Sequence, residues 1–209
     1  RTLAQFPDQV AVTLPECFEA ASELRDAIMG FTGQTVESME HPLVAASRLV
    51  PDDLCVMEYR QQEWRLTGAV VCSPSRWSLA SKIGRTLTDI HRPVPGYVDE
   101  LARPTEQFFD RVAVEKPVWR LNWTLLDSPE LFQPQSARRP VVGDPSSWWF
   151  RVERQTLVRL PISEAVIFTI RTYVTALPDL VTSHPDMRGA LLTALDTAPP
   201  ETLKYKGWT

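Results

Sequence analysis

The chain has 209 residues, 44% of them hydrophobic and 23% charged, which is an ordinary mixture for one globular domain with a sizeable core. A net charge of -4 argues against nucleic acid or an anionic membrane surface as the main partner. The longest apolar runs fall far short of the roughly 20 residues that cross a bilayer. Three cysteines without a CxxC pair and no visible signal peptide predict a cytoplasmic protein.

The first part of the chain, residues 1–53, is predicted to form an accessory helical layer. An amphipathic helix should begin at Pro15 and end at Gly30, because apolar residues recur at helical spacing between them. A second short helix is expected over residues 43–50, after an exposed His41.

Residues 54–59 and 64–72 alternate like strands around a polar turn at 61–63, which predicts a β-hairpin. A helix should follow from Ser78, with an apolar stripe that runs to Ile90. Pro93 stops that helix and places His91 in its last turn. A histidine there can simply cap carbonyls at the negative end of the helix dipole, or it can bind a metal.

Further along, a helix over residues 97–112 should be kinked or split by Pro104, and three strands follow at residues 118–123, 148–160 and 164–174. A Pro-, Ser- and Gly-rich loop is expected at 128–147. This order predicts an α+β, PAS-like antiparallel sheet of about five strands, with helices on one face. The sheet core would span residues 54–174, and C-terminal helices would occupy residues 175–209, with His184 exposed at a helix entry and a polar tail after Pro200.

Polar side chains interrupt the apolar strands. In the first of the three strands, Trp119, Leu121 and Trp123 should share one side and Arg120 and Asn122 the other. An unpaired charge that faces a core is costly, so such residues either line a solvated face or meet a ligand. The candidates are Arg120, Asn122, Arg151, Glu153, Arg154, Arg159 and Arg171.

Several segments together resemble a known family. The stretches SPSRW, IHRPVPGY, PVWRLNW and RVERQTLVRLP are similar to those of the haem-dependent oxidative N-demethylases, over roughly residues 54–174. The resemblance implies a PAS-like fold that binds haem b. It also implies that dioxygen, with electrons from NAD(P)H through a separate reductase or other subunits, oxidises a methyl group of a small secondary amine such as dimethylamine and yields formaldehyde.

On this resemblance, His91 is the expected iron ligand, Arg154 and Arg159 are the first choices for the haem propionates, and Arg171 is the next. Trp119 and Trp123 could form walls of the haem slot, and Glu153 is the candidate to bind the amine, unless it pairs with a neighbouring arginine. Two alternatives remain open at this point. One is a haem- or small-molecule-binding PAS-like sensor without turnover, and the other is an interaction domain in which His91 only caps a helix.

Overall fold

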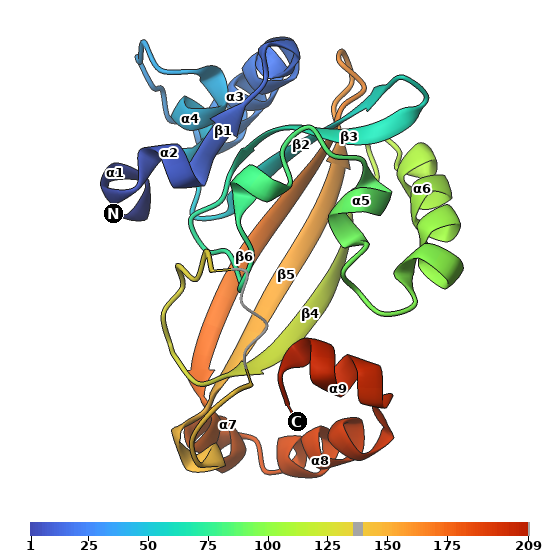
Figure 1. Ribbon diagram of the computed structural model, residues 1–209. Helices are drawn as coiled ribbons and strands as arrows, with labels where there is room; N and C mark the ends of the chain where they lie inside the picture. The colour runs from blue at the N-terminus through green and yellow to red at the C-terminus, as the bar shows by residue number, and fades with distance from the viewer. Residues whose placement is uncertain (136–139, 209) are drawn as a thin grey trace.

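The structure is a computed structural model that describes residues 1–135 and 140–208. It is α+β, with one open antiparallel sheet in the order β1-β3-β2-β6-β5-β4 and helices around it (Figure 1). The strands are β1 Ala11–Thr13, β2 Asp53–Arg60, β3 Glu63–Val70, β4 Val118–Leu126, β5 Trp149–Arg159 and β6 Val166–Ala176.

The sheet has six strands where about five were expected. The additional strand is β1, which pairs with β3 in a part of the chain that was predicted to be only helical. Three residues are too few to show an alternating pattern, so the sequence carries no signal for this strand.

The predicted hairpin of β2 and β3 is confirmed. Its two turn residues, Gln61 and Gln62, have φ angles of 53° and 67°. Positive φ at both central residues is the type I′ geometry, whose twist matches that of paired strands. The register shifts at Val56 and Met57, where β3 carries one extra residue.

The α-helices in the described part of the chain surround the sheet. They are α1 Thr2–Gln5, α2 Pro7–Val10, α3 Phe18–Thr32, α4 Pro42–Ser47, α5 Leu87–His91, α6 Ala102–Arg111, α7 Leu177–Ser183, α8 Asp186–Thr197 and α9 Pro200–Lys206. Short 3-10 turns lie at η1 Pro15–Cys17, η2 Leu79–Ser81 and η4 Pro145–Ser147, and a π-helical turn lies at η3 Tyr97–Leu101. No helix among the described residues is long and apolar enough to span a membrane.

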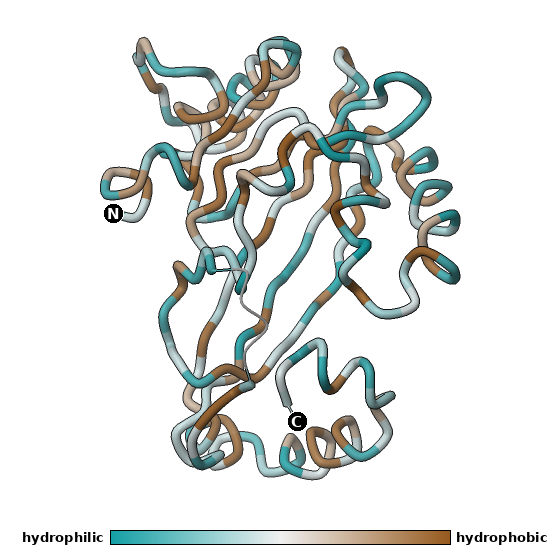
Figure 2. Tube along the Cα trace, viewed as in Figure 1, coloured by the Kyte–Doolittle hydropathy of each residue, from teal (hydrophilic) through white to brown (hydrophobic). Residues whose placement is uncertain are grey.

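One face of the sheet packs against α3 and α4, where Leu54, Val56 and Ile167 meet Leu24 and Leu43. Figure 2 shows hydrophobic and hydrophilic residues alternating along the strands, as expected for a sheet whose two faces differ.

The helix layer lies close to β3, since a Cβ on Gly68 would overlap Cys17 Sγ. Helix α3 continues past the predicted stop at Gly30 and ends at Gly33, which takes the left-handed conformation with φ of 68°. A glycine inside a helix costs only about 1 kcal/mol, so the helix can continue through Gly30 for a few more residues.

The opposite face packs against α5 and α6, where Cys55, Met57 and Leu157 meet Leu87 and Phe109. The single helix predicted from Ser78 to His91 is instead broken into η2 and α5. Gly84, with φ of 73°, donates to Leu66 O at 2.8 Å, so this part of the chain pairs with β3 and leaves the helix. A long-range pairing of this kind is not visible in local periodicity.

The predicted split of the helix over residues 97–112 is confirmed, because η3 ends at Leu101 and α6 begins at Ala102. Pro104 lies in the first turn of α6, where its missing N–H would have had no partner in the helix.

A third cluster joins the C-terminal helices to the far end of the sheet, around Leu125, Phe150 and Leu191. The tail that was expected to be polar forms α9, and Trp208 stacks on Trp123 with 5.2 Å between ring centroids. His184 is exposed before α8, as predicted. The predicted loop at 128–147 is largely irregular where it is described, and residues 136–139 of it lie outside the described residues.

Candidate functional site

His91 ends α5, and its ring is held by the helix itself. Nδ1 lies 2.9 Å from the Leu87 carbonyl oxygen. A carbonyl can only accept, so Nδ1 carries the hydrogen and Nε2 keeps its lone pair. No hydrogen bond to Nε2 is formed within the part of the chain that the structure describes. The imidazole is therefore fixed in one tautomer with one nitrogen available.

Tyr97 covers one side of this imidazole. The two rings stack at 4.7 Å with an angle of 18° between their planes. The connection is short because Val94 N donates to His91 O at 2.8 Å and Gly96 takes a φ of 70°. Tyr97 is only 5% exposed, and its hydroxyl has no hydrogen bond of good geometry among the described residues. Burial raises the pKa of this phenol, although the Thr105 hydroxyl partly opposes the rise.

Two cations lie near His91. Burial lowers the pKa of His91, Lys82 and Arg120 lower it further, and only the hydrogen bond to Leu87 acts against them. Lys82 donates Nζ to the Ile90 carbonyl, and burial lowers the pKa of Lys82 as well. His91 is thus neutral to lower pH than an exposed histidine. The sequence did not point to Lys82, because the turn that brings it back to Ile90 comes from the unpredicted break between η2 and α5.

Glu153 lies within a polar network on the same sheet face. Arg120 Nε donates to Gln155 Oε1 at 2.8 Å, and Gln155 Nε2 donates to Glu153 Oε2 at 3.0 Å. The other carboxylate oxygen accepts from Arg151 Nε at 3.2 Å, and Asn122 Nδ2 lies 3.4 Å from Oε2. The sequence left open whether Glu153 pairs with a neighbouring arginine, and in the structure it pairs with Arg151.

Arg151 anchors the segment that follows β3. Its side chain is 1% exposed and donates to the carbonyl oxygens of Ser73 and Leu131. Asp53 holds the same segment, because its carboxylate accepts from Cys72 N at 2.7 Å and from Ser73 N at 3.0 Å. Burial raises the pKa of Asp53 to about 6, although both hydrogen bonds and Arg151 act to lower it. Asp53 was not selected from the sequence, since nothing local indicates these distant donors.

Arg154 and Arg171 lie on the other face of the sheet. Arg154 is in register with Leu121 on β4 and with Arg171 on β6, whereas its neighbour Glu153 pairs with Asn122 and Thr172. Residues directly opposite on antiparallel strands share a face, and adjacent residues alternate. Arg154 approaches Asp52 only at 4.0 Å.

The two tryptophans proposed as haem walls also lie on this second face, in register with Thr156 and Val152. Trp119 is 67% exposed, and Trp123 stacks on Trp208 in the C-terminal cluster. The predicted alternation along β4 is confirmed, but its apolar side is exposed at Trp119 and Leu121.

Arg159 lies on the same face as Glu153, but its guanidinium is already bonded to backbone carbonyl groups. It donates to the carbonyl oxygens of Val112 at 2.6 Å and Phe109 at 2.7 Å, at the end of α6, and to that of Glu164 at 3.0 Å. Its guanidinium also lies 5.2 Å from the Trp64 ring centroid. Glu153 and helix α5, which carries His91, therefore lie on one face of the sheet, and Arg154, Arg171 and the tryptophans lie on the other.

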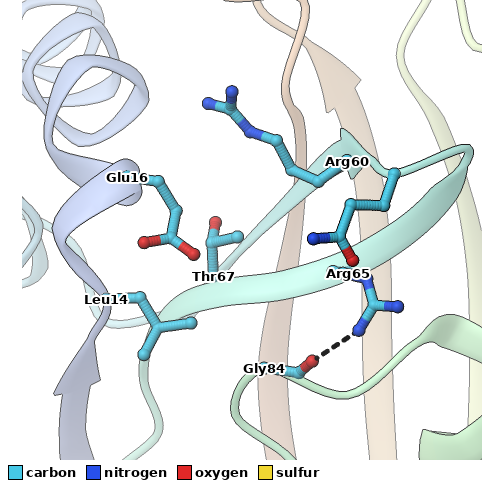
Figure 3. A pocket seen from close by; sticks show the side chains of 7 residues that line it. Leu14, Glu16, Arg60, Arg65, Thr67 and Gly84 are labelled. Atoms are coloured by element: carbon cyan, nitrogen blue, oxygen red, sulfur yellow. Dashed lines mark hydrogen bonds between the residues drawn. The ribbon is translucent and has the colours of Figure 1, made fainter.

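A separate open pocket of about 310 Å³ lies under the tip of the β2–β3 hairpin (Figure 3). Arg65 donates to the Gly84 carbonyl oxygen at one side of the pocket, Glu16 directs its carboxylate toward Thr67, and Arg60 extends away from Gly84. It does not include His91, Glu153 or any other residue selected from the sequence. We place the candidate site at His91, because its imidazole has a free nitrogen that can bind a metal, and not at this pocket.

Within the described residues, no group of three or more His, Cys, Asp or Glu side chains is arranged to hold a metal ion. An imidazole fixed through Nδ1, with free Nε2 and two nearby cations, is suited to a cofactor that brings its own equatorial ligands and acidic groups, as haem does. The site and fold thus define a candidate haem protein of the α+β class. The chain belongs to the haem-dependent oxidative N-demethylase, alpha subunit-like family, whose sequence model matches residues 2–209.

Proposed function

We propose that this chain is the haem-binding subunit of an oxidative N-demethylase and that His91 Nε2 ligates the iron. The observation that carries the proposal is the 2.9 Å hydrogen bond from His91 Nδ1 to the Leu87 carbonyl oxygen. Histidine ligands in proteins commonly donate their second nitrogen in this way, because the bond sets the tautomer and the ring orientation. The stack on Tyr97 removes the remaining rotational freedom of the ring.

The surroundings of His91 fit a haem. We assign the propionates to Arg120 and Lys82, the two cations that act on His91. Arg120 uses Nε toward Gln155, which leaves its terminal nitrogens for a carboxylate. Arg154 and Arg171 lie on the opposite face and Arg159 is held by the end of α6, so we do not assign them to the same haem.

A bound haem would activate dioxygen, with electrons from NAD(P)H through a separate reductase. This chemistry would oxidise a methyl group of a small secondary amine such as dimethylamine and release formaldehyde. Glu153 would bind the ammonium form of the amine. Its longest hydrogen bond, 3.4 Å from Asn122 Nδ2, is the one that an ammonium donor would replace. Charge favours the exchange, since an ammonium donor brings a full positive charge to the carboxylate and the Asn122 amide does not.

We also propose that strands β2 to β6 form a PAS-like unit in the cytoplasm. Without β1, the sheet order is β3-β2-β6-β5-β4, so the hairpin and the three later strands form one contiguous sheet. The free cysteines Cys17, Cys55 and Cys72 fit a reducing compartment. Membership of the family favours the demethylase over a sensor without turnover.

The test is turnover by the haem-loaded protein. Supplied with dioxygen and an NAD(P)H-dependent reductase, it should release formaldehyde from dimethylamine, and reductase alone should not. Glu153→Gln should weaken amine binding, followed as a spectral shift of the haem, about tenfold or more while haem affinity stays constant. If the haem-loaded protein neither binds amine nor forms formaldehyde, the proposal is wrong and a haem-binding sensor without turnover is the better interpretation.

A further inference from the structure

The outer edge of β4 is covered along only half of its length. At its C-terminal half, Lys206 Nζ donates to Trp123 O at 2.8 Å and Trp208 Nε1 donates to Leu125 O at 3.2 Å. Figure 1 shows β4 as the last strand of the sheet, with α9 beside this end. Residues two apart on a strand direct their N–H and C=O groups the same way. Trp119 and Leu121 therefore direct theirs outward too, where no described residue bonds to them.

The side chains at this uncovered half are also unusual for a free edge. Trp119 is 67% exposed and Leu121 is 59% exposed. Natural sheets protect free edges with charges, proline or bulges, because an apolar edge with open backbone groups recruits another strand. Here the half beside α9 is covered by Lys206 and Trp208, and Arg120 is the one charged side chain in residues 118–122 of the uncovered half.

The charge around the uncovered half selects the occupant. Leu121 is in register with Arg154, and Arg154 with Arg171, so two arginines line the face beside it. Arg154 forms a long ion pair with Asp52, at 4.0 Å. Antiparallel pairing of residues 118–122 with the same residues of a second copy would place the two Arg120 side chains opposite one another and would add Arg154 and Arg171 of both copies to one sheet. A segment with acidic side chains would instead be attracted.

We propose that residues 118–122 of β4 bind an extended acidic and apolar segment of a different protein subunit, which adds to the sheet as a further strand. Its apolar residues would pack on Trp119 and Leu121, and its acids would be attracted by Arg154, across β4 on the same face. Main-chain hydrogen bonds supply affinity in this mode and alternate side chains supply specificity. The site lies on the face away from His91, so it does not depend on haem or on the proposed reaction.

The probe is a synthetic blocked peptide, Glu-Thr-Val-Thr-Val-Thr-Glu, which carries both valines and both acids on one side. Added to the full chain, it should shift and protect the Trp119 and Leu121 amides in ¹⁵N spectra and in hydrogen exchange. Two matched peptides serve as controls, one with Lys in place of each Glu and one N-methylated on the groups that face β4. Each control should bind at least about tenfold more weakly.

The protein variants are Leu121→Pro and Trp119→Lys. Leu121→Pro removes only an outward N–H, a position where edge strands tolerate proline, and it should abolish peptide binding. Trp119→Lys keeps the backbone and should weaken binding about tenfold if the proline variant unfolds. The absence of any change at Trp119 and Leu121 up to about 1 mM peptide overturns the proposal. Dimers that form through β4 of the chain alone would overturn the choice of a different subunit.

Discussion

The two faces of the β4-β5-β6 sheet are built from alternate residues of the same strands, yet they are opposite in character. One face has Arg151 at 1% exposure, bonded to Glu153 and to the segment after β3. The other has Trp119 at 67% exposure beside Arg154. The charged face is covered around Arg151, because Arg151 and Asp53 bind backbone from distant segments. Hydropathy alone therefore does not decide which side of this sheet is buried.

The strongest test of this contrast compares two arginines three residues apart. Arg151→Met should lower the free energy of unfolding by about 3 to 5 kcal/mol, because it leaves Glu153 and the Ser73 carbonyl without their buried cation. Arg154→Met is the matched control on the exposed face and should change stability by less than about 0.5 kcal/mol. Urea unfolding of both variants measures the difference, and equal losses would show that the faces do not differ as described.

Arg159 provides a smaller effect on the covered face. Arg159→Met should cost about 2 to 3 kcal/mol of unfolding free energy, because the carbonyl groups at the end of α6 lose a charged donor. Arg171→Met is its counterpart on the other face and should be nearly neutral, since Arg171 contacts only the Tyr173 ring among the interactions described. Hydrogen exchange should also show faster opening of α6 in the Arg159 variant alone, and unchanged exchange there would contradict the role of Arg159.

The raised pKa of Asp53 makes the stability of the protein depend on pH. Its pKa is about 6 in the fold, above the ordinary value near 4, so the native state holds the proton more tightly. Its contribution to stability is then complete below about pH 4 and is lost as the pH rises through about 6. The stability of the wild type relative to Asp53→Asn should therefore grow by on the order of 2 kcal/mol as pH falls from about 7 to 4. Urea titrations across this range would refute the assignment if the difference stayed constant.

The sequence predicted the elements that local pattern controls. The hairpin, the three later strands, the split near Pro104 and the position of His91 at a helix end all follow from periodicity and proline. Strand β1 and the break at Gly84 were not predictable, because both depend on pairing with β3.

The candidate site was only partly readable for the same reason. The sequence identified His91 and Glu153, but it could not assign strand arginines to faces without knowing which face is covered. Lys82 and Asp53 were missed since their partners, Ile90 O and the amides of Cys72 and Ser73, are backbone groups. A sequence shows which side chains are charged, but it does not show which distant backbone groups they will hydrogen-bond.

The account rests most on His91 Nε2, and the direct measurement is the absorption spectrum of the chain titrated with haem. The wild type should bind haem with the Soret band of a histidine-ligated iron. His91→Gly should lose that band and regain it when free imidazole is added, while His41→Gly and His184→Gly keep the wild-type spectrum. An unchanged spectrum in His91→Gly, or its loss in either control variant, would contradict the assignment of His91 as the iron ligand.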